Sequence, residues 1–289
     1  PGTLDGRRLM LSVGHDEYWT WTMRDAVAEF AASGGHVAFL SGNTACWQVR
    51  LEEDGRTMVG YKDQFAHDPV VGTKKEQLVT SLWSDSMVGR PENEMTGVTF
   101  SRGGYHRIGQ NVARGAGGYT VYRPAHWVFE GTGVGYGDLI GAEAVTVGYE
   151  CDGCALTFSD GLPKPTGADG TPAEFQILAL APAEHFNRSN ALRPVPDTSL
   201  SEVEFFAERV LGNHEPASIA RLSHGHAVMG VHEPGGTVFT SGTTEWVWGV
   251  ANADPVIERI TRNLLERLGG QSATLPTSSP SSELTDEDP

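Results

Sequence analysis

Polar side chains that could bind a metal or transfer protons follow two apolar segments near the start of the sequence. His15 and Glu17 come just after the apolar run 8–13 and are two residues apart, so both can face one cleft. Asn43 follows a second apolar run. Because ligands of open parallel sheets bind outside the carboxyl ends of the strands, Asn43 lies near Glu17 if the two strands are neighbours. Alternatively, Asp16 or Glu17 only stabilises the N-terminus of the following helix.

The elements that must position these residues form a strand–helix–strand pattern. Residues 8–13 (RLMLSV) and 36–40 (HVAFL) are short apolar runs, typical of buried strands. Between them, apolar residues recur with helical spacing over about residues 20–33, and Thr20 or Thr22 can cap the helix. Such a βαβ unit makes the two strands parallel.

The middle of the chain predicts irregular structure followed by further strands. Turn residues are dense from Thr44 to about Gly118, which indicates a lid-like or inserted region. The further strand candidates are residues 119–122, 144–150, 155–158, 175–181, 217–222, 227–232 and 237–240. We therefore predict a three-layer α/β fold with a mainly parallel sheet, an inserted loop region and extra β-hairpins.

The C-terminal part predicts one long helix and then an irregular tail. Asp254 is a suitable N-cap, Pro255 follows at the first helical position, and apolar residues recur along one face up to a pair of glycines. Residues 271–289 are acidic and rich in Ser, Thr and Pro, which predicts a disordered tail. No linker interrupts residues 1–270, so we predict a single domain over that span.

The charge of the chain limits its partners. The 289 residues include 21 Lys and Arg and 37 Asp and Glu, a formal net charge of −16. We therefore expect neither nucleic acid nor an anionic membrane surface as a partner. Three cysteines do not make a disulfide framework, so cysteine usage does not fix the compartment, and the cytoplasm is only our default expectation. Because the chain begins at Pro1 without a signal-like stretch, we expect a processed product or a fragment.

Cysteine and histidine residues offer three further candidate sites. Cys46 could be an amidase nucleophile, but GNTACWQ lacks the Gly-x-Cys-x-Gly elbow, so a buried thiol is the preferred interpretation. Cys151 and Cys154 form a lone C-x-x-C pair, which is weak support for a zinc or redox site. His224 and His226 could share one strand face and bind zinc, although a polar turn before a strand is preferred.

Five motifs occur in order across residues 1–270: GHDEYW, GGHVAFLSGNTACWQVR, HWVFEGTGV, GYECDG and GTTEWVWG. Together they resemble the C-terminal catalytic domain of the N,N-dimethylformamidase large (beta) subunit family. The resemblance implies a sheet domain similar to the class I glutamine amidotransferases. It also implies hydrolysis of the C–N bond of a small amide at a mononuclear ferric iron, which two tyrosinates and one carboxylate hold.

The resemblance also implies roles for individual residues. Glu17 matches the carboxylate that binds iron, and His15 and Asn43 match residues that line the active site. Glu150 matches a second pocket glutamate, and a lysine near position 62 matches another pocket residue. The metal would polarise the amide carbonyl. Glu150 would then act as general base, His15 as proton donor or orienter, and Asn43 as a hydrogen-bond donor to the carbonyl oxygen or the water.

The tyrosine ligands are the point at which this sequence departs from the family. In the family they lie well upstream of the His-x-Glu motif, whereas this sequence has only 14 residues before His15. We therefore expect weak iron binding unless a homo-oligomer, an upstream segment or a second subunit supplies phenolates. The leading hypothesis is a formamidase-like, iron-dependent hydrolase domain. The alternatives are a non-catalytic ligand-binding or assembly module and a cysteine amidase that uses Cys46.

Overall fold

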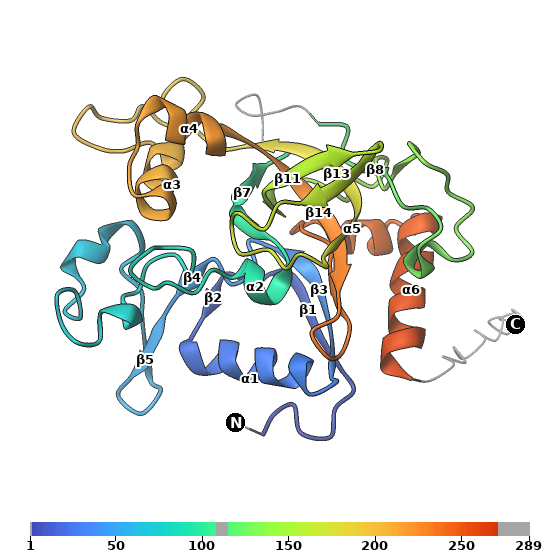
Figure 1. Cartoon of the computed structure of the whole chain (residues 1–289), viewed down its shortest axis with the longest axis horizontal. Coiled ribbons are helices and arrows are strands. Elements are labelled where there is room, and N and C mark those ends of the chain that lie inside the picture. Colours follow the sequence, from blue (N-terminus) through green and yellow to red (C-terminus); the bar gives the residue numbers. More distant parts are fainter. Residues whose placement is uncertain (1, 108–114, 271–289) are drawn as a thin grey trace, which may run out of the picture.

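A mixed β-sheet forms the centre of the protein in a computed structural model that describes residues 2–107 and 115–270 (Figure 1). The predicted tail, residues 271–289, lies outside the described residues. The main path of the sheet runs in the order β1 (Leu9–His15), β3 (His36–Gly42), β15 (Val238–Thr240), β14 (His224–His232), β13 (Gln176–Glu184), β7 (Thr99–Tyr105) and β10 (Glu150–Gly153). In addition, β8 (Tyr119–Val121) pairs with β13, and β9 (Leu139–Ile140) pairs with β8.

Only part of this sheet is parallel. Strand β3 is parallel to β1 and to β15, which confirms the parallel pair predicted around the first helix. The other paired neighbours in the sheet are antiparallel. The prediction of a mainly parallel sheet therefore holds for this one part, and the sheet as a whole is mixed. The antiparallel part arises because strands such as β14 and β15 are joined by a short turn rather than by a crossover helix.

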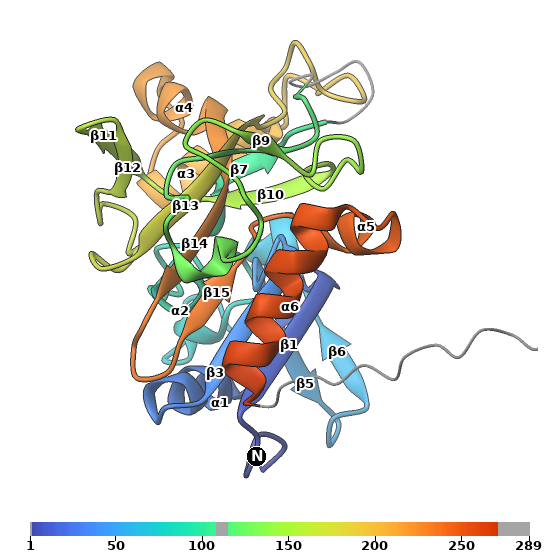
Figure 2. The same ribbon diagram turned by 90° about the vertical axis from the view of Figure 1, so that its right-hand side faces the viewer.

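Helices cover both faces of the parallel part. Phe39 of β3 belongs to the apolar core beneath α1 (Trp21–Ala32), whereas its neighbour Leu40 belongs to the core beneath α6 (Pro255–Gly269). Successive side chains of a strand point to opposite faces, so one strand serves both cores. Figure 2 shows α6 across the face of β1 and β3. This half of the molecule thus has the predicted three layers.

The ends of these two helices agree with the sequence prediction. The Thr20 hydroxyl accepts a hydrogen bond from the Met23 backbone N–H at 3.2 Å and caps α1. The Asp254 carboxylate accepts two backbone N–H groups at 3.0 Å and caps α6, with Pro255 at the first helical position. The buried stripe of α6 comprises Ile257, Ile260, Leu264 and Leu268.

Two predicted strands are wrong, and several helices were not predicted. Residues 217–222 lie in α4 (Pro216–Ser223), where Pro216 begins the helix and the buried face follows a helical period. Residues 144–149 form turns, and β10 begins only at Glu150. Helix α3 (Glu202–Leu211) begins with a reciprocal capping box between Ser201 and Glu204, a signature that is visible in the sequence.

Smaller elements complete the structure. They are β2 (Tyr18–Trp19), β4 (Trp47–Gln48), β5 (Arg50–Glu52), β6 (Thr57–Val59), α2 (Asn93–Thr96), β11 (Leu156–Ser159), β12 (Leu162–Pro165), α5 (Trp246–Ala251) and the 3₁₀ turns Lys62–His67, Glu76–Leu78 and Trp127–Phe129. The segment after Asn43 contributes many of them, in agreement with an inserted region. Among the described residues, no helix combines the length and the apolar character needed to cross a membrane.

Candidate active site

The parallel pairing of β1 and β3 brings His15 and Asn43 together. His15 is in register with Gly42, so the next residue of the chain, Asn43, lies at the same edge of the sheet. The Asn43 side-chain amide lies 3.4 Å from His15 Nε2 and donates a hydrogen bond to Glu150 Oε2 at 3.0 Å. Asn43 adopts a left-handed backbone conformation with φ of 50°, which an asparagine tolerates better than most residues.

A histidine–glutamate pair forms the centre of this arrangement. His15 Nε2 lies 2.5 Å from Glu150 Oε2 and 3.7 Å from Glu17 Oε2. The hydrogen bond to Glu150 raises the pKa of His15, although burial acts in the opposite direction. Glu150 is almost fully buried, whereas the His15 side chain is 42% exposed and can exchange protons with solvent. The pair can therefore accept a proton on one side and release it on the other.

A buried aspartate behind the site fixes the backbone that carries Asn43. Asp152 Oδ1 accepts the Asn43 backbone N–H at 2.9 Å, and Oδ2 accepts that of Thr44 at 3.0 Å. Burial raises the pKa of Asp152 to about 7. Sequence reasoning missed this residue. Its signal is the alternation along β10, where Glu150 and Asp152 are two residues apart and both acidic.

Glu17 is held by a lysine from the inserted region. Lys62 Nζ lies 3.4 Å from Glu17 Oε1 and 3.0 Å from the Tyr18 hydroxyl, and it lies 4.8 Å from the centre of the Trp47 ring. Burial would lower the pKa of Lys62, but the hydrogen bond to Tyr18 and the charge of Glu17 raise it. Lys62 is therefore a cation at this edge of the site.

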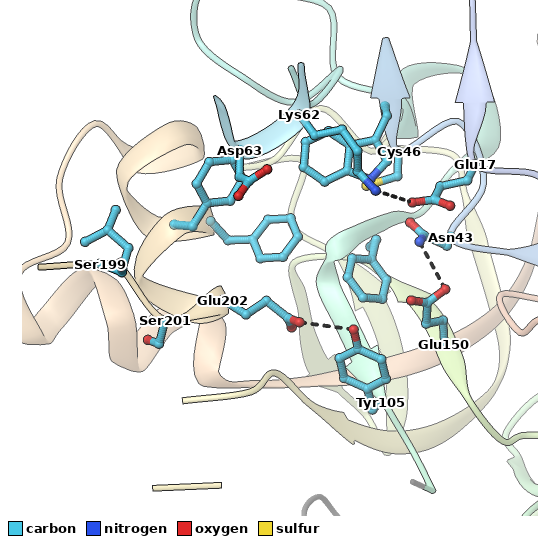
Figure 3. Close-up of a pocket in the computed structure, with 15 residues that line it drawn as sticks. Glu17, Asn43, Cys46, Lys62, Asp63, Tyr105, Glu150, Ser199, Ser201 and Glu202 are labelled. Atoms are coloured by element: carbon cyan, nitrogen blue, oxygen red, sulfur yellow. Dashed lines mark hydrogen bonds and ion pairs between the residues drawn. The ribbon is translucent and has the colours of Figure 1, made fainter. Parts of the chain in front are cut away.

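These side chains open into one cavity of about 550 Å³. Glu17, Asn43, Lys62 and Glu150 line it at one side, as Figure 3 shows. The predicted carboxylate at position 17 and amide at position 43 thus face a shared cavity. His15 is not itself a lining residue, but it contacts Glu150 and Asn43, which are. The four predicted site residues are brought together, whereas their chemical roles stay predictions.

The described residues do not by themselves fit the ferric iron that the resemblance implies. The tyrosine nearest to Glu17 is Tyr18, whose hydroxyl contacts Lys62 and whose pKa is raised by burial. Burial also raises the pKa of Tyr105, whose hydroxyl donates to Glu202 at 3.0 Å. Both phenols therefore favour the neutral form rather than the phenolate that binds iron. Nor do the described residues contain a metal-compatible group of three or more His, Cys, Asp or Glu side chains.

The other candidates lie elsewhere or lack partners for chemistry. Cys46 lines the cavity, but it is almost fully buried and burial raises the pKa of its thiol well above its usual value. Cys151 and Cys154 are buried free thiols that belong to separate apolar clusters. His224 is exposed and lies 3.8 Å from Glu184. Within the described ranges, neither the C-x-x-C pair nor the histidine pair belongs to a metal-compatible group.

Comparison with known proteins agrees with the motif order. The model of a family described as "N,N-dimethylformamidase beta subunit-like, C-terminal" matches residues 1–258. The N,N-dimethylformamidase beta subunit of Paracoccus aminophilus is 25% identical over 282 residues, which cover 89% of this chain and 31% of that protein. The chain thus spans about a third of the length of this relative.

Proposed function

The chain belongs to the N,N-dimethylformamidase beta subunit-like C-terminal family, and from this premise we propose that it is a hydrolase domain that cleaves the C–N bond of a small amide. The observation that carries the proposal is the contact of His15 Nε2 with Glu150 Oε2 at 2.5 Å, with the Asn43 amide 3.0 Å from the same carboxylate oxygen. A proton-transfer pair and a hydrogen-bond donor thus meet beside one cavity. The relative is an N,N-dimethylformamidase subunit, which supports an amide substrate.

Amide hydrolysis requires proton transfers that this arrangement can perform. Glu150 and His15 together would accept a proton from the attacking water and return it to the nitrogen of the departing amine. The Asn43 Nδ2 group would donate to the water or the carbonyl oxygen. Its Oδ1 atom is buried without a hydrogen-bond partner among the described residues, so it can accept a hydrogen bond from the substrate or the water.

Among the described residues, we propose only Glu17 as an iron ligand. When bound, a ferric ion would act as a Lewis acid on the amide carbonyl. Because the described residues provide one suitable carboxylate and no favoured phenolate, we assign no step to the ion. We propose Glu17 as the ligand that this domain would contribute, with the remaining ligands from outside the described residues. Lys62, at 3.4 Å, would hold the carboxylate in place in the absence of the ion.

The alternative is a non-catalytic ligand-binding module of the same family. The observation in its favour is the pairing of Glu17 with Lys62 rather than with a set of metal ligands. Such a module would bind small amides in the cavity without consuming them. Substitution of the proton-transfer pair distinguishes the two functions, because only a hydrolase loses a chemical step.

The test measures amine release from small formamides by the purified protein supplied with ferric iron. We expect Glu150→Gln to lower kcat by about 10²-fold to 10⁴-fold, because it removes the proton acceptor and leaves the shape unchanged. The matched control is His224→Gln, which alters a side chain that is 80% exposed and outside the cavity lining. Equal activity of Glu150→Gln and the native protein would contradict the proposal. An inactive native protein that still binds formamides would favour the non-catalytic module.

A further inference from the structure

The cavity extends well beyond the residues that would act on an amide bond. One side carries Glu17, Asn43 and Glu150, while the other side reaches α3, which contributes Glu202 and two phenylalanines. Figure 3 draws the aromatic rings between Glu202 and Glu17. The space near the polar side alone would hold a small amide. The rest of the cavity can therefore hold a further part of the ligand.

Aromatic side chains from three separate parts of the chain form the wall of this extension. The Trp47 and Phe205 rings lie 6.1 Å apart, and the Phe100 and Phe206 rings lie 5.6 Å apart at an interplanar angle of 62°. Trp47, Phe100 and Phe206 are nearly buried, so their rings are fixed by packing. Edge and tilted ring arrangements of this kind are favourable for a further aromatic ring as well.

The cavity is several times larger than a dialkylformamide. The cavity measures about 550 Å³. A dialkylformamide occupies on the order of 100 Å³ if each of its few heavy atoms takes somewhat less space than the roughly 30 Å³ of a water molecule. Cavities of roughly 300–1,000 Å³ are typical of sites that enclose larger organic ligands. The extension can therefore hold a ring in addition to the amide.

The charges along the cavity restrict this ligand further. Four acidic residues line it, whereas Lys62 is the cation among the described lining residues. The lining acids are Glu17, Asp63, Glu150 and Glu202. At the far side, Glu202 accepts hydrogen bonds from Tyr105 at 3.0 Å and lies 2.8 Å from His185 Nδ1. A carboxylate has room for further donors. A neutral or cationic ligand is therefore favoured over an anionic one.

We infer that the natural substrate is an amide with an aryl-bearing substituent of neutral or positive charge, whose ring lies in the cavity against the wall formed by Trp47, Phe100, Phe205 and Phe206. This inference rests on the proposed function for the position of the amide group. The ring would displace water from an apolar wall and so add binding energy that a dialkylformamide lacks. It would also fix the distance of the amide from Glu150 and Asn43, since the ring would be held at one end of the cavity.

Binding to the full 289-residue chain tests the inference. The probes are N-phenethylformamide, its para-carboxy analogue and N,N-dimethylformamide, each titrated by saturation-transfer NMR. We expect the phenethyl compound to bind at least about tenfold more tightly than dimethylformamide, which corresponds to about 1.4 kcal/mol. We expect the carboxylate analogue to lose this advantage. Equal dissociation constants for the phenethyl and dimethyl compounds would overturn the inference without the use of any variant.

Substitutions then locate the ring. Phe205→Ala should reduce the preference for the phenethyl compound to less than threefold, because it removes a wall of the extension. The matched control is Phe158→Ala on β11, a phenylalanine that is 52% exposed and outside the cavity lining. It should leave the preference unchanged. A folded Phe205→Ala protein with the native preference would contradict the assigned place of the ring.

The outcome is independent of turnover, so failure of the inference and failure of the proposed function can be told apart. Preferential binding of the phenethyl compound without cleavage of any amide would contradict the hydrolase proposal and support the aryl site. Cleavage of dimethylformamide with no preference for the phenethyl compound would support the hydrolase proposal and overturn the aryl site.

Discussion

Arg209 anchors the helix that forms the far wall of the cavity, and its replacement gives the sharpest stability prediction. Arg209 on α3 donates to both carboxylate oxygens of Asp85, each at 2.7 Å. Asp85 is fully buried and also accepts from the Ser81 hydroxyl at 2.7 Å and the Met87 backbone N–H at 2.8 Å. The Arg209 guanidinium lies 3.9 Å from the centre of the Phe65 ring. The pair thus joins α3 to the inserted region.

Arg209→Met would leave the Asp85 carboxylate buried without its cation. Removal of one partner of a buried ion pair costs about 3–5 kcal/mol, because the remaining charge is desolvated and uncompensated. For a chain of this size, this lowers the melting temperature by on the order of 10 °C. Arg188→Met is the matched control. Arg188 lies outside α3 and pairs with Glu204 of this helix, but its side chain is 41% exposed, so we expect a much smaller loss of stability than for Arg209→Met.

The assay is urea unfolding of the native protein and both variants, with tryptophan fluorescence as the readout. Arg209→Met should lower the unfolding midpoint markedly and Arg188→Met only slightly. Because α3 carries Phe205 and Phe206, Arg209→Met should also weaken binding of the phenethyl probe more than binding of dimethylformamide. An Arg209→Met protein within 1 kcal/mol of the native free energy of unfolding would refute the assigned role of this ion pair.

Two further predictions concern the backbone near the site and the pH dependence of stability. A Cβ atom at Gly42 would lie 2.5 Å from the Thr244 backbone nitrogen, so Gly42→Ala should lower the free energy of unfolding by about 1–3 kcal/mol and remove most of the hydrolytic activity. The control Gly60→Ala should fold normally, because its Cβ atom would meet only a valine methyl group at 3.5 Å. Equal melting temperatures of the two variants would contradict this prediction. Burial raises the pKa of Glu92 from 4.5 to about 7, so its contribution to stability is complete below about pH 4.5 and is lost as the pH rises through about 7. Glu92→Gln should therefore gain stability relative to the native protein between pH 5 and pH 8 in urea titrations, and a constant difference would show that Glu92 is not the group responsible.

The first half of the site could be predicted because it depends on local order. Two apolar runs joined by one helix make neighbouring parallel strands, and such strands end at the same sheet edge. Glu17 and Asn43 therefore line the same cavity, as the order of the strands predicted, and His15 lies 3.4 Å from Asn43. Glu150 is different. It lies 107 residues beyond Asn43 in the chain, and only the family motif suggested that it belongs to the same pocket.

The missed features depend on contacts between segments that are far apart in the sequence. Asp152 is buried and accepts backbone N–H groups of residues more than a hundred positions away. The aromatic wall combines Trp47, Phe100 and Phe205 from three distant segments. The error at residues 217–222 has another cause: a short apolar run is compatible with either a strand or a helix, and Pro216 at its start decides for the helix.

The central claim is that this domain breaks the C–N bond of an amide, and isotope labelling tests it most directly. The protein, supplied with ferric iron, is incubated with N-phenethylformamide in ¹⁸O-labelled water, and both products are quantified by mass spectrometry. We predict equal amounts of free amine and of formate that carries one labelled oxygen, and loss of both products with Glu150→Gln. Recovery of the unchanged amide after demonstrated binding would contradict the claim.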